Sequence, residues 1–166
     1  MNSLVVMGVA GCGKSSLGQA VAQAIGRPLI EGDDFHSESN RAKMRAAVPL
    51  TDADRDGWLD ALTRELARHS QGVVLTCSAL KRRYRDILRA GGGEVRFVHL
   101  HGERALITRR MDARTGHFMP AALLDSQLRD LEPLEPDEAG VTLDVRDPPD
   151  KLVEQALLSL PEPGID

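Results

Sequence analysis

A nine-residue segment near the start of the chain, GVAGCGKSS at positions 8–16, constrains the fold more than any other feature of the sequence. Its first eight residues match the pattern G-x-x-x-x-G-K-[ST] at every fixed position. The apolar run 4–7 precedes the segment, and apolar residues at helical spacing follow it as far as Gly26. A strand, a glycine-rich loop and a helix in this order predict a loop that binds the phosphates of a nucleotide.

The residues of this loop suit the binding of a phosphate chain. The glycines let successive backbone N–H groups face an anion, and the start of the following helix adds partial positive charge. Lys14 is expected to reach the β- and γ-phosphates, and the Ser15 hydroxyl is expected to hold Mg²⁺. The predicted nucleotide-binding residues are Gly8, Gly11, Cys12, Gly13, Lys14, Ser15 and Ser16. The alternative interpretation is an ordinary glycine-rich turn between a strand and a helix.

Five apolar runs have the length of buried strands and alternate with helical patterns. They are residues 4–7, 28–30, 73–77, 95–100 and 141–145. This alternation predicts an α/β fold with a doubly wound parallel sheet, and the length of 166 residues suits a single domain, 1–166. Ligands of such sheets bind at the carboxyl ends of the strands. The loops that follow the strands are therefore the expected place of the site.

Composition argues against several classes of partner. The net charge of −4 and an aromatic content of 3% do not favour a nucleic-acid-binding surface. No run approaches the roughly 20 apolar residues of a membrane span, so no membrane partner is expected. The two cysteines, Cys12 and Cys77, fall near predicted strand ends rather than in a disulfide pattern, which favours a reducing cytoplasm.

Three carboxylates follow the second predicted strand, in the stretch EGDDFH at 31–36. A kinase needs a carboxylate beside the acceptor hydroxyl and positive charge around the transferred group. Glu31 and Asp33 are two residues apart and could project the same way from an extended segment. One could orient Mg²⁺ through water while the other takes the hydroxyl proton. The alternative is a solvated acidic turn or a helix cap.

Two basic segments could bind anions. Arg110 and Arg114 share a helical face and could clamp phosphates, with residues 115–116 as the hinge of a closing lid. Lys81 opens a basic stretch after the third predicted strand and could bind an anionic acceptor. Each segment could instead be a solvated face of a helix. Trp58 is expected to pack in or over the core.

Five stretches together resemble the gluconokinases of the P-loop type, which phosphorylate D-gluconate on its 6-hydroxyl with ATP. They are VMGVAGCGKSS, EGDDFH, NRAKMRAAVPLTDADRDGWL, LTCSALKRRYRDILR and RTGHFMP. The resemblance spans residue 4 to about 160. It implies a fold like that of adenylate and shikimate kinases, with a five-stranded parallel sheet, a substrate-binding insert at about 36–70 and a lid at about 110–124. It also implies ATP and Mg²⁺ as cofactors, gluconate as the small-molecule partner, and a homodimer.

The resemblance also assigns roles to individual residues. Asp33 matches the family's acidic residue nearest the acceptor hydroxyl, and the lid arginines Arg110 and Arg114 would act with Lys14 in catalysis. The residues expected around gluconate are Asp33, His36, Arg45, Ser78, Lys81, His117 and Gln127. Lys81 is the expected partner of the gluconate carboxylate. Glu31 stands where the family often has aspartate.

Three other functions stay open at this point. The first is a kinase of another small acceptor, such as shikimate or a nucleoside monophosphate. The second is a GTP-binding switch, because residues 54–57 fit D-x-x-G, although they lead into a helical pattern and no N-K-x-D motif occurs. The third is a module that binds a nucleotide without catalysis.

Overall fold

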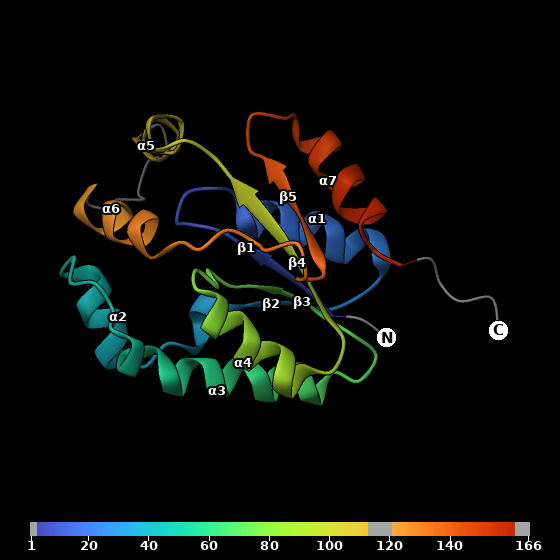
Figure 1. Cartoon of the computed structure of the whole chain (residues 1–166), viewed down its shortest axis with the longest axis horizontal. Helices are drawn as coiled ribbons and strands as arrows, with labels where there is room; N and C mark the ends of the chain where they lie inside the picture. Colours follow the sequence, from blue (N-terminus) through green and yellow to red (C-terminus); the bar gives the residue numbers. More distant parts are fainter. Residues whose placement is uncertain (1–2, 113–120, 162–166) are drawn as a thin grey trace.

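A five-stranded parallel sheet forms the centre of the protein, for which a computed structural model describes residues 3–112 and 121–161 (Figure 1). The strands are β1 (Ser3–Met7), β2 (Leu29–Glu31), β3 (Val74–Thr76), β4 (Val95–His101) and β5 (Gly140–Asp144). Their order across the sheet is β2-β3-β1-β4-β5, and every neighbouring pair is parallel. The predicted α/β fold with a five-stranded parallel sheet is confirmed, and each strand end lies within one residue of its expected position.

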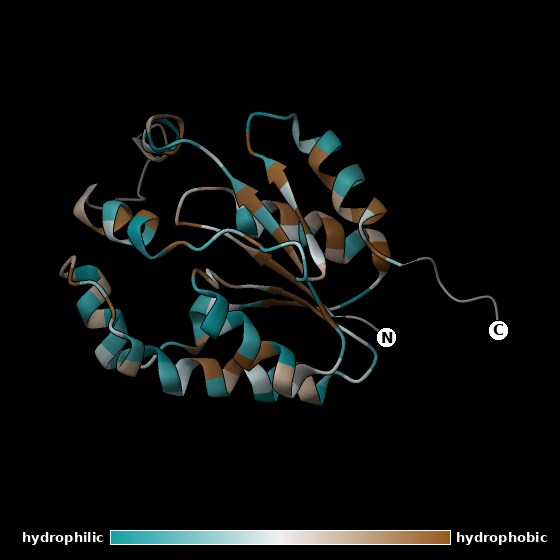
Figure 2. Cartoon of the chain, in the orientation of Figure 1, coloured by the Kyte–Doolittle hydropathy of each residue, from teal (hydrophilic) through white to brown (hydrophobic). Residues whose placement is uncertain are grey.

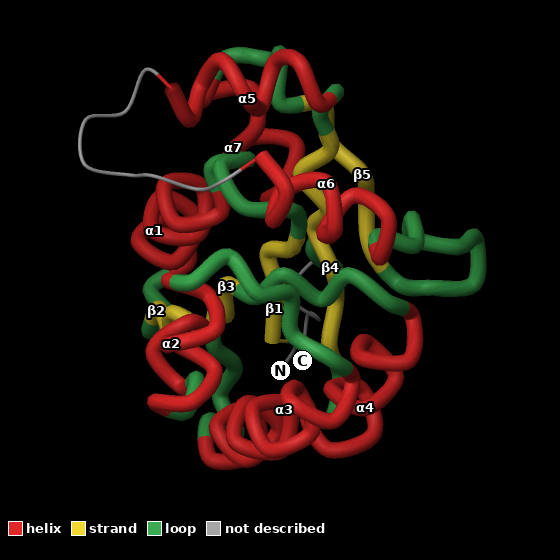
Figure 3. Tube along the Cα trace, turned by 90° about the vertical axis from the view of Figure 1, so that its left-hand side faces the viewer, coloured by secondary structure: helices red, strands yellow, loops and turns green. Residues whose placement is uncertain are grey.

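Helices cover both faces of this sheet and gather at the carboxyl ends of its strands (Figures 1 and 3). Helices α1 (Lys14–Ile25) and α7 (Pro149–Leu158) pack on one face, and α3 (Asp52–Arg68) and α4 (Arg82–Gly92) pack together on the other. The elements near the strand ends are the 3₁₀ turn η1 (Gly32–Phe35), α2 (Glu38–Arg45), α5 (Arg104–Asp112) and α6 (Ala121–Asp130). Within the described residues, no helix is long and apolar enough to cross a bilayer.

Strand β1 joins the two halves of the core because all five of its residues are buried. Alternate side chains of a strand point to opposite faces, so Leu4 and Val6 join the cluster beneath α1 and α7. Val5 and Met7 join the cluster beneath α3 and α4. The strands are accordingly apolar along most of their length (Figure 2), as expected for a parallel sheet covered on both faces.

Helix α3 begins with a reciprocal cap that uses one residue of the D-x-x-G segment. The Asp54 carboxylate accepts a hydrogen bond from the Thr51 N–H (2.9 Å), and the Thr51 hydroxyl oxygen accepts one from the Asp54 N–H (3.1 Å). This capping box satisfies N–H groups that the first helical turn leaves without a partner. Asp54 is therefore the N3 residue of a helix capping box, which does not support the GTP-switch interpretation.

His99 on β4 is a buried histidine that is expected to make folding sensitive to mild acid. The side chain is 1% exposed, and neither ring nitrogen has a hydrogen-bond partner within the described part of the chain. Burial, and then the charges of His101, Arg85 and Lys14, lower the pKa of His99 to about 4. Between pH 6.5 and pH 4 the unfolded chain therefore holds a proton on this histidine that the folded chain excludes. Stability from this source falls as the pH is lowered through that window.

We expect the free energy of unfolding to fall by about 2 kcal/mol between pH 7 and pH 5 because of His99, and a His99→Leu variant to lose that part of the pH dependence. Urea unfolding at the two pH values measures the difference. A His69→Leu variant serves as the control, since His69 is partly exposed and should leave the dependence in place. Equal pH dependence in wild type and His99→Leu would contradict the assignment.

Candidate active site

The phosphate loop joins β1 to α1 and forms an anion site at the start of that helix. Gly13, the N-cap residue, has φ 98°, a left-handed conformation that favours glycine. Because glycine has no side chain to cap the helix, the N–H groups of the first turn stay available to an anion. The Lys14 ammonium donates to the carbonyl oxygens of Gly8 (3.0 Å) and Val9 (3.1 Å), which holds its positive charge over the loop.

Glu31 at the end of β2 reaches the predicted metal-binding hydroxyl. Its Oε2 accepts hydrogen bonds from Ser15 Oγ (3.1 Å) and from Thr76 Oγ1. The described residues hold no cluster of three or more histidine, cysteine or acidic side chains that could bind a metal ion by themselves. One hydroxyl beside one carboxylate nevertheless fits Mg²⁺, which takes oxygen ligands and in kinases completes its shell with phosphates and water.

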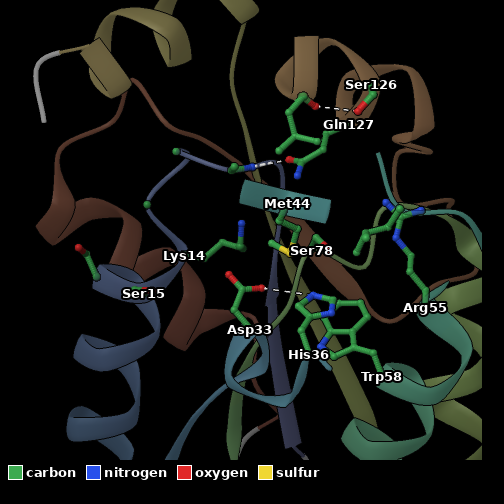
Figure 4. Close-up of a pocket in the computed structure, with 16 residues that line it drawn as sticks. Lys14, Ser15, Asp33, His36, Met44, Arg55, Trp58, Ser78, Ser126 and Gln127 are labelled. Atoms are coloured by element: carbon green, nitrogen blue, oxygen red, sulfur yellow. Dashed lines mark hydrogen bonds and ion pairs between the residues drawn. The ribbon is translucent and has the colours of Figure 1, made fainter. Parts of the chain in front are cut away.

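Asp33 projects from η1 into the same space as Lys14 (Figure 4). Its carboxylate is 72% exposed and lies 3.9 Å from His36 Nε2. The His36 ring is buried and accepts at Nδ1 from the Asn40 amide (3.3 Å), so the neutral ring carries its proton on Nε2, facing Asp33. Burial lowers the pKa of His36 although Asp33 partly opposes this, which favours the neutral form. The Asp33 carboxylate is therefore accessible to a ligand in this space.

The turn that carries Asp33 is fixed by contacts of its backbone. The Trp58 indole N–H donates to the Gly32 carbonyl oxygen (2.8 Å), and the indole stacks on His36 with ring centroids 4.3 Å apart. A Cβ atom on residue 32 would lie 2.3 Å from the Thr76 carbonyl oxygen, so glycine alone lets this turn approach β3. The position of Asp33 is thus set by the sheet and by α3.

Arg55 is a candidate site residue that the sequence analysis missed. It projects from α3 into the pocket that contains Lys14 and Asp33 (Figure 4), and its side chain is 8% exposed. Its Nη1 donates to the Tyr84 hydroxyl (3.0 Å), and Asp130 lies 3.7 Å away. A signal was present in the sequence, because Arg55 lies three residues before Trp58 on the apolar stripe of α3. Charged side chains are rarely buried, so an arginine on the buried stripe of a helix indicates a binding or structural role.

The loop after β3 brings Ser78 to the same pocket. Ala79, which is buried, has φ 46°, a left-handed conformation that is uncommon for alanine. Buried Arg85 holds this turn, since its Nη1 donates to the Ala79 carbonyl oxygen (3.0 Å) while its Nε donates to Glu138 (2.7 Å). Backbone strain of this kind persists where the surroundings enforce it, which is common at functional sites.

Gln127 on α6 closes the pocket from the side opposite Asp33 (Figure 4). Its Oε1 accepts a hydrogen bond from the Ala10 N–H of the phosphate loop (2.8 Å). The amide nitrogen of Gln127 is a donor only, so it remains suited to a hydroxyl oxygen of a ligand. This contact ties α6 directly to the phosphate loop.

The pocket has a volume of about 280 Å³ and gathers several of the expected residues, but not all. Those that line it are Gly11, Gly13, Lys14, Ser15, Ser16, Asp33, His36, Ser78 and Gln127. Lys81 does not line it and pairs with Asp52 instead (3.1 Å). Arg45 is exposed, and its neighbour Met44 lines the pocket in its place. Arg114 and His117 lie outside the described residues.

A second and mostly apolar pocket of about 400 Å³ adjoins the first at the start of α1. Both pockets share Gly13 and Ser16, and Cys12 lines the second. Pro149 and Arg110 also line the second pocket, and Arg110 Nη2 donates to the Val145 carbonyl oxygen (2.7 Å). A nucleotide could therefore place its phosphates over the loop and its base in this second pocket.

Comparisons with known proteins identify relatives of this chain. The family model for shikimate kinase matches residues 10–143. A probable gluconokinase of Rattus norvegicus is 47% identical over 152 residues, covering 78% of this chain and 82% of its own. The gluconokinase of Gluconobacter oxydans is 42% identical over 157 residues, covering 93% and 88%. The crystal structure of a gluconokinase from Sinorhizobium meliloti superposes with a TM-score of 0.90 at 48% identity, covering 95% of this chain and 90% of that one.

Proposed function

This chain belongs to the gluconokinase family, and from that premise we infer that it transfers a phosphoryl group from ATP to gluconate. The oxygen of the 6-hydroxyl attacks the γ-phosphorus, and the bond between that phosphorus and the bridging oxygen of ADP breaks. The hydroxyl proton leaves as the new bond forms. The products are 6-phospho-D-gluconate and ADP.

One observation carries this function: a single pocket joins the phosphate loop to the two groups that a sugar acid requires. Asp33, beside Lys14, can accept the proton of the attacking hydroxyl. Arg55 supplies a guanidinium on another wall, and a guanidinium pairs with a carboxylate through two parallel hydrogen bonds. A sugar acid presents a hydroxyl at one end and a carboxylate at the other.

We assign the nucleotide to the phosphate loop and to the second pocket. Backbone N–H groups of the loop and Lys14 hold the phosphates, and the apolar pocket beside Cys12 and Arg110 takes the base. Ser15 and Glu31 would hold Mg²⁺, which when bound neutralises charge on the phosphates. Lys14 then stays with the transferred group and stabilises the negative charge on its oxygens.

We assign the acceptor to the first pocket. Asp33 orients the 6-hydroxyl, and the neutral ring of His36 lies beside it, with Nε2 3.9 Å from the Asp33 carboxylate. Ser78 and the amide of Gln127 bond to hydroxyls along the sugar chain. We assign the binding of the gluconate carboxylate to Arg55 rather than to Lys81, the residue expected from the sequence, because Arg55 lines the pocket and Lys81 does not.

Several expectations from the family resemblance become part of the same proposal. The single domain spans 1–166, with an insert at about 36–70 that carries Arg55 and a lid at about 110–124 that carries Arg110. The lid would close over bound ATP and exclude water from the transferred phosphoryl group. The enzyme would work as a homodimer in the cytoplasm, where its two buried cysteines stay free.

We expect gluconate to exceed D-glucose, shikimate and AMP as an acceptor by at least about tenfold in kcat/KM. Glucose lacks the carboxylate, and a site that leaves buried polar groups unpaired rejects such an analogue. Coupled measurement of ADP release with each acceptor, and with ATP or GTP as donor, tests this. Preferred use of shikimate or AMP would assign the other acceptor class. Nucleotide binding without turnover of any acceptor would indicate a module that is not a kinase.

A further inference from the structure

Tyr84 on α4 stands between the pocket arginine and an acidic side chain outside the pocket. We propose that Tyr84 is a positioning residue whose hydroxyl orients the Arg55 guanidinium toward the acceptor carboxylate. The inference rests on the proposed function, because it requires an acceptor that carries a carboxylate. It deepens that function by naming a residue, outside the pocket lining, that sets the preference for sugar acids.

The hydrogen bonds around Tyr84 can run in one direction only. Arg55 Nη1 lies 3.0 Å from the Tyr84 hydroxyl and can only donate. The same hydroxyl contacts Asp52 Oδ1, and a carboxylate can only accept. The phenol proton therefore points to Asp52, and an oxygen lone pair is left for Arg55. This fixes one corner of the guanidinium and leaves other N–H groups of Arg55 for the pocket.

The ring of Tyr84 adds a second restraint on the same guanidinium. The ring is buried, and the guanidinium carbon of Arg55 lies 5.3 Å from the ring centroid, within the range of a cation–π contact. An arginine held at one nitrogen and over one ring has few orientations open to it. Little conformational entropy is then lost when Arg55 binds a ligand, which favours affinity.

Asp52 anchors this chain of contacts because it is itself held by cations. Lys81 Nζ lies 3.1 Å from its Oδ1, and Arg83 Nη1 lies 3.3 Å from its Oδ2. Hydrogen bonds from Tyr84 and Lys81 lower the pKa of the Asp52 carboxyl, so it remains an acceptor. Lys81 thus affects the acceptor site only at a distance, through Asp52 and Tyr84.

A second carboxylate competes for the Arg55 guanidinium, so the orientation of this group depends on the Tyr84 hydroxyl. Asp130 at the end of α6 lies 3.7 Å from Arg55 Nη1. If the Tyr84 hydroxyl is removed, Asp130 can draw the guanidinium out of its orientation toward the pocket. The expected cost is weaker binding of the acceptor carboxylate, with little change at the reacting hydroxyl.

The test is Tyr84→Phe, which removes the hydroxyl and keeps the ring. We expect KM for gluconate to rise about tenfold, while kcat and KM for ATP change by less than about twofold. D-Glucitol has the hydroxyl chain of gluconate without the carboxylate, so its kcat/KM should stay the same in the variant. A purely structural defect would lower kcat/KM for gluconate and for D-glucitol alike, and that result would overturn the proposal.

A double-mutant cycle with Arg55→Met tests whether Tyr84 acts through Arg55, with gluconate as the only acceptor. If Tyr84 acts through Arg55, then Tyr84→Phe should change kcat/KM for gluconate by less than about twofold in the Arg55→Met background. A full tenfold loss in both backgrounds would show that the two residues act independently and would refute the inference. Wild-type turnover of gluconate is measured in the same series, so a failure of the proposed function is seen separately.

Discussion

Replacing Asp33 by asparagine is expected to lower kcat for gluconate by roughly 10²-fold or more, within the range for loss of a general base. Asparagine keeps the shape of the side chain but can neither carry the negative charge nor accept the hydroxyl proton. In the proposed arrangement the ATP phosphates lie over the loop, away from Asp33, so KM for ATP should change little. Steady-state kinetics with gluconate and ATP varied in turn measure both effects.

Asp34→Asn provides the matched control for this substitution. Asp34 is exposed on the same 3₁₀ turn but does not line the pocket, so its replacement should leave kcat within about twofold of wild type. Near-normal turnover by a folded Asp33→Asn variant would move the role to another group. A large loss in Asp34→Asn would identify its carboxylate as the one to examine.

Arg55→Met is expected to lower kcat/KM for gluconate by about 10²-fold or more, mainly through KM. The change removes the Arg55 guanidinium from the pocket wall, where it is proposed to pair with the gluconate carboxylate. Truncating one partner of a buried charged pair is costly. KM for ATP should remain close to that of wild type, because Arg55 does not line the second pocket. Initial rates over a range of gluconate concentrations give the two constants.

Lys81→Met is the comparison that decides between the two candidate cations. Lys81 pairs with Asp52 outside the pocket, so its loss should raise KM for gluconate by no more than about threefold. If Lys81→Met were as damaging as Arg55→Met, the carboxylate would bind nearer Lys81, as the sequence analysis expected. Intact folding of both variants is checked by thermal unfolding.

The fold could be predicted because the sequence patterns that specify it lie within short segments of the chain. Each strand is a short apolar run, and the phosphate loop has a fixed spacing of glycines between a strand and a helix. Parallel strands place their carboxyl ends at one edge, so the predicted loops carrying Asp33 and Ser78 do meet in one pocket. These outcomes depend on patterns within a few residues of each other.

The pocket wall proposed to bind the acceptor carboxylate could not be predicted, because it depends on long-range contacts that residue spacing does not encode. Lys81 and Arg55 are both basic, but Lys81 is held by Asp52, 29 positions away in the sequence. Arg55 is buried because α3 turns its apolar stripe, and Arg55 with it, toward the sheet. Which of two cations meets a ligand is decided by helix rotation and by long-range pairing.

The stacking of Trp58 on His36 gives the protein a built-in optical probe. The chain contains one tryptophan, and its indole lines the pocket proposed to bind the acceptor while its N–H holds the turn that carries Asp33. Indole emission responds to the polarity and the neighbours of the ring. Intrinsic fluorescence excited at the indole band therefore reports on the acceptor pocket without a label, and a gluconate titration in the absence of ATP can be followed from that single residue.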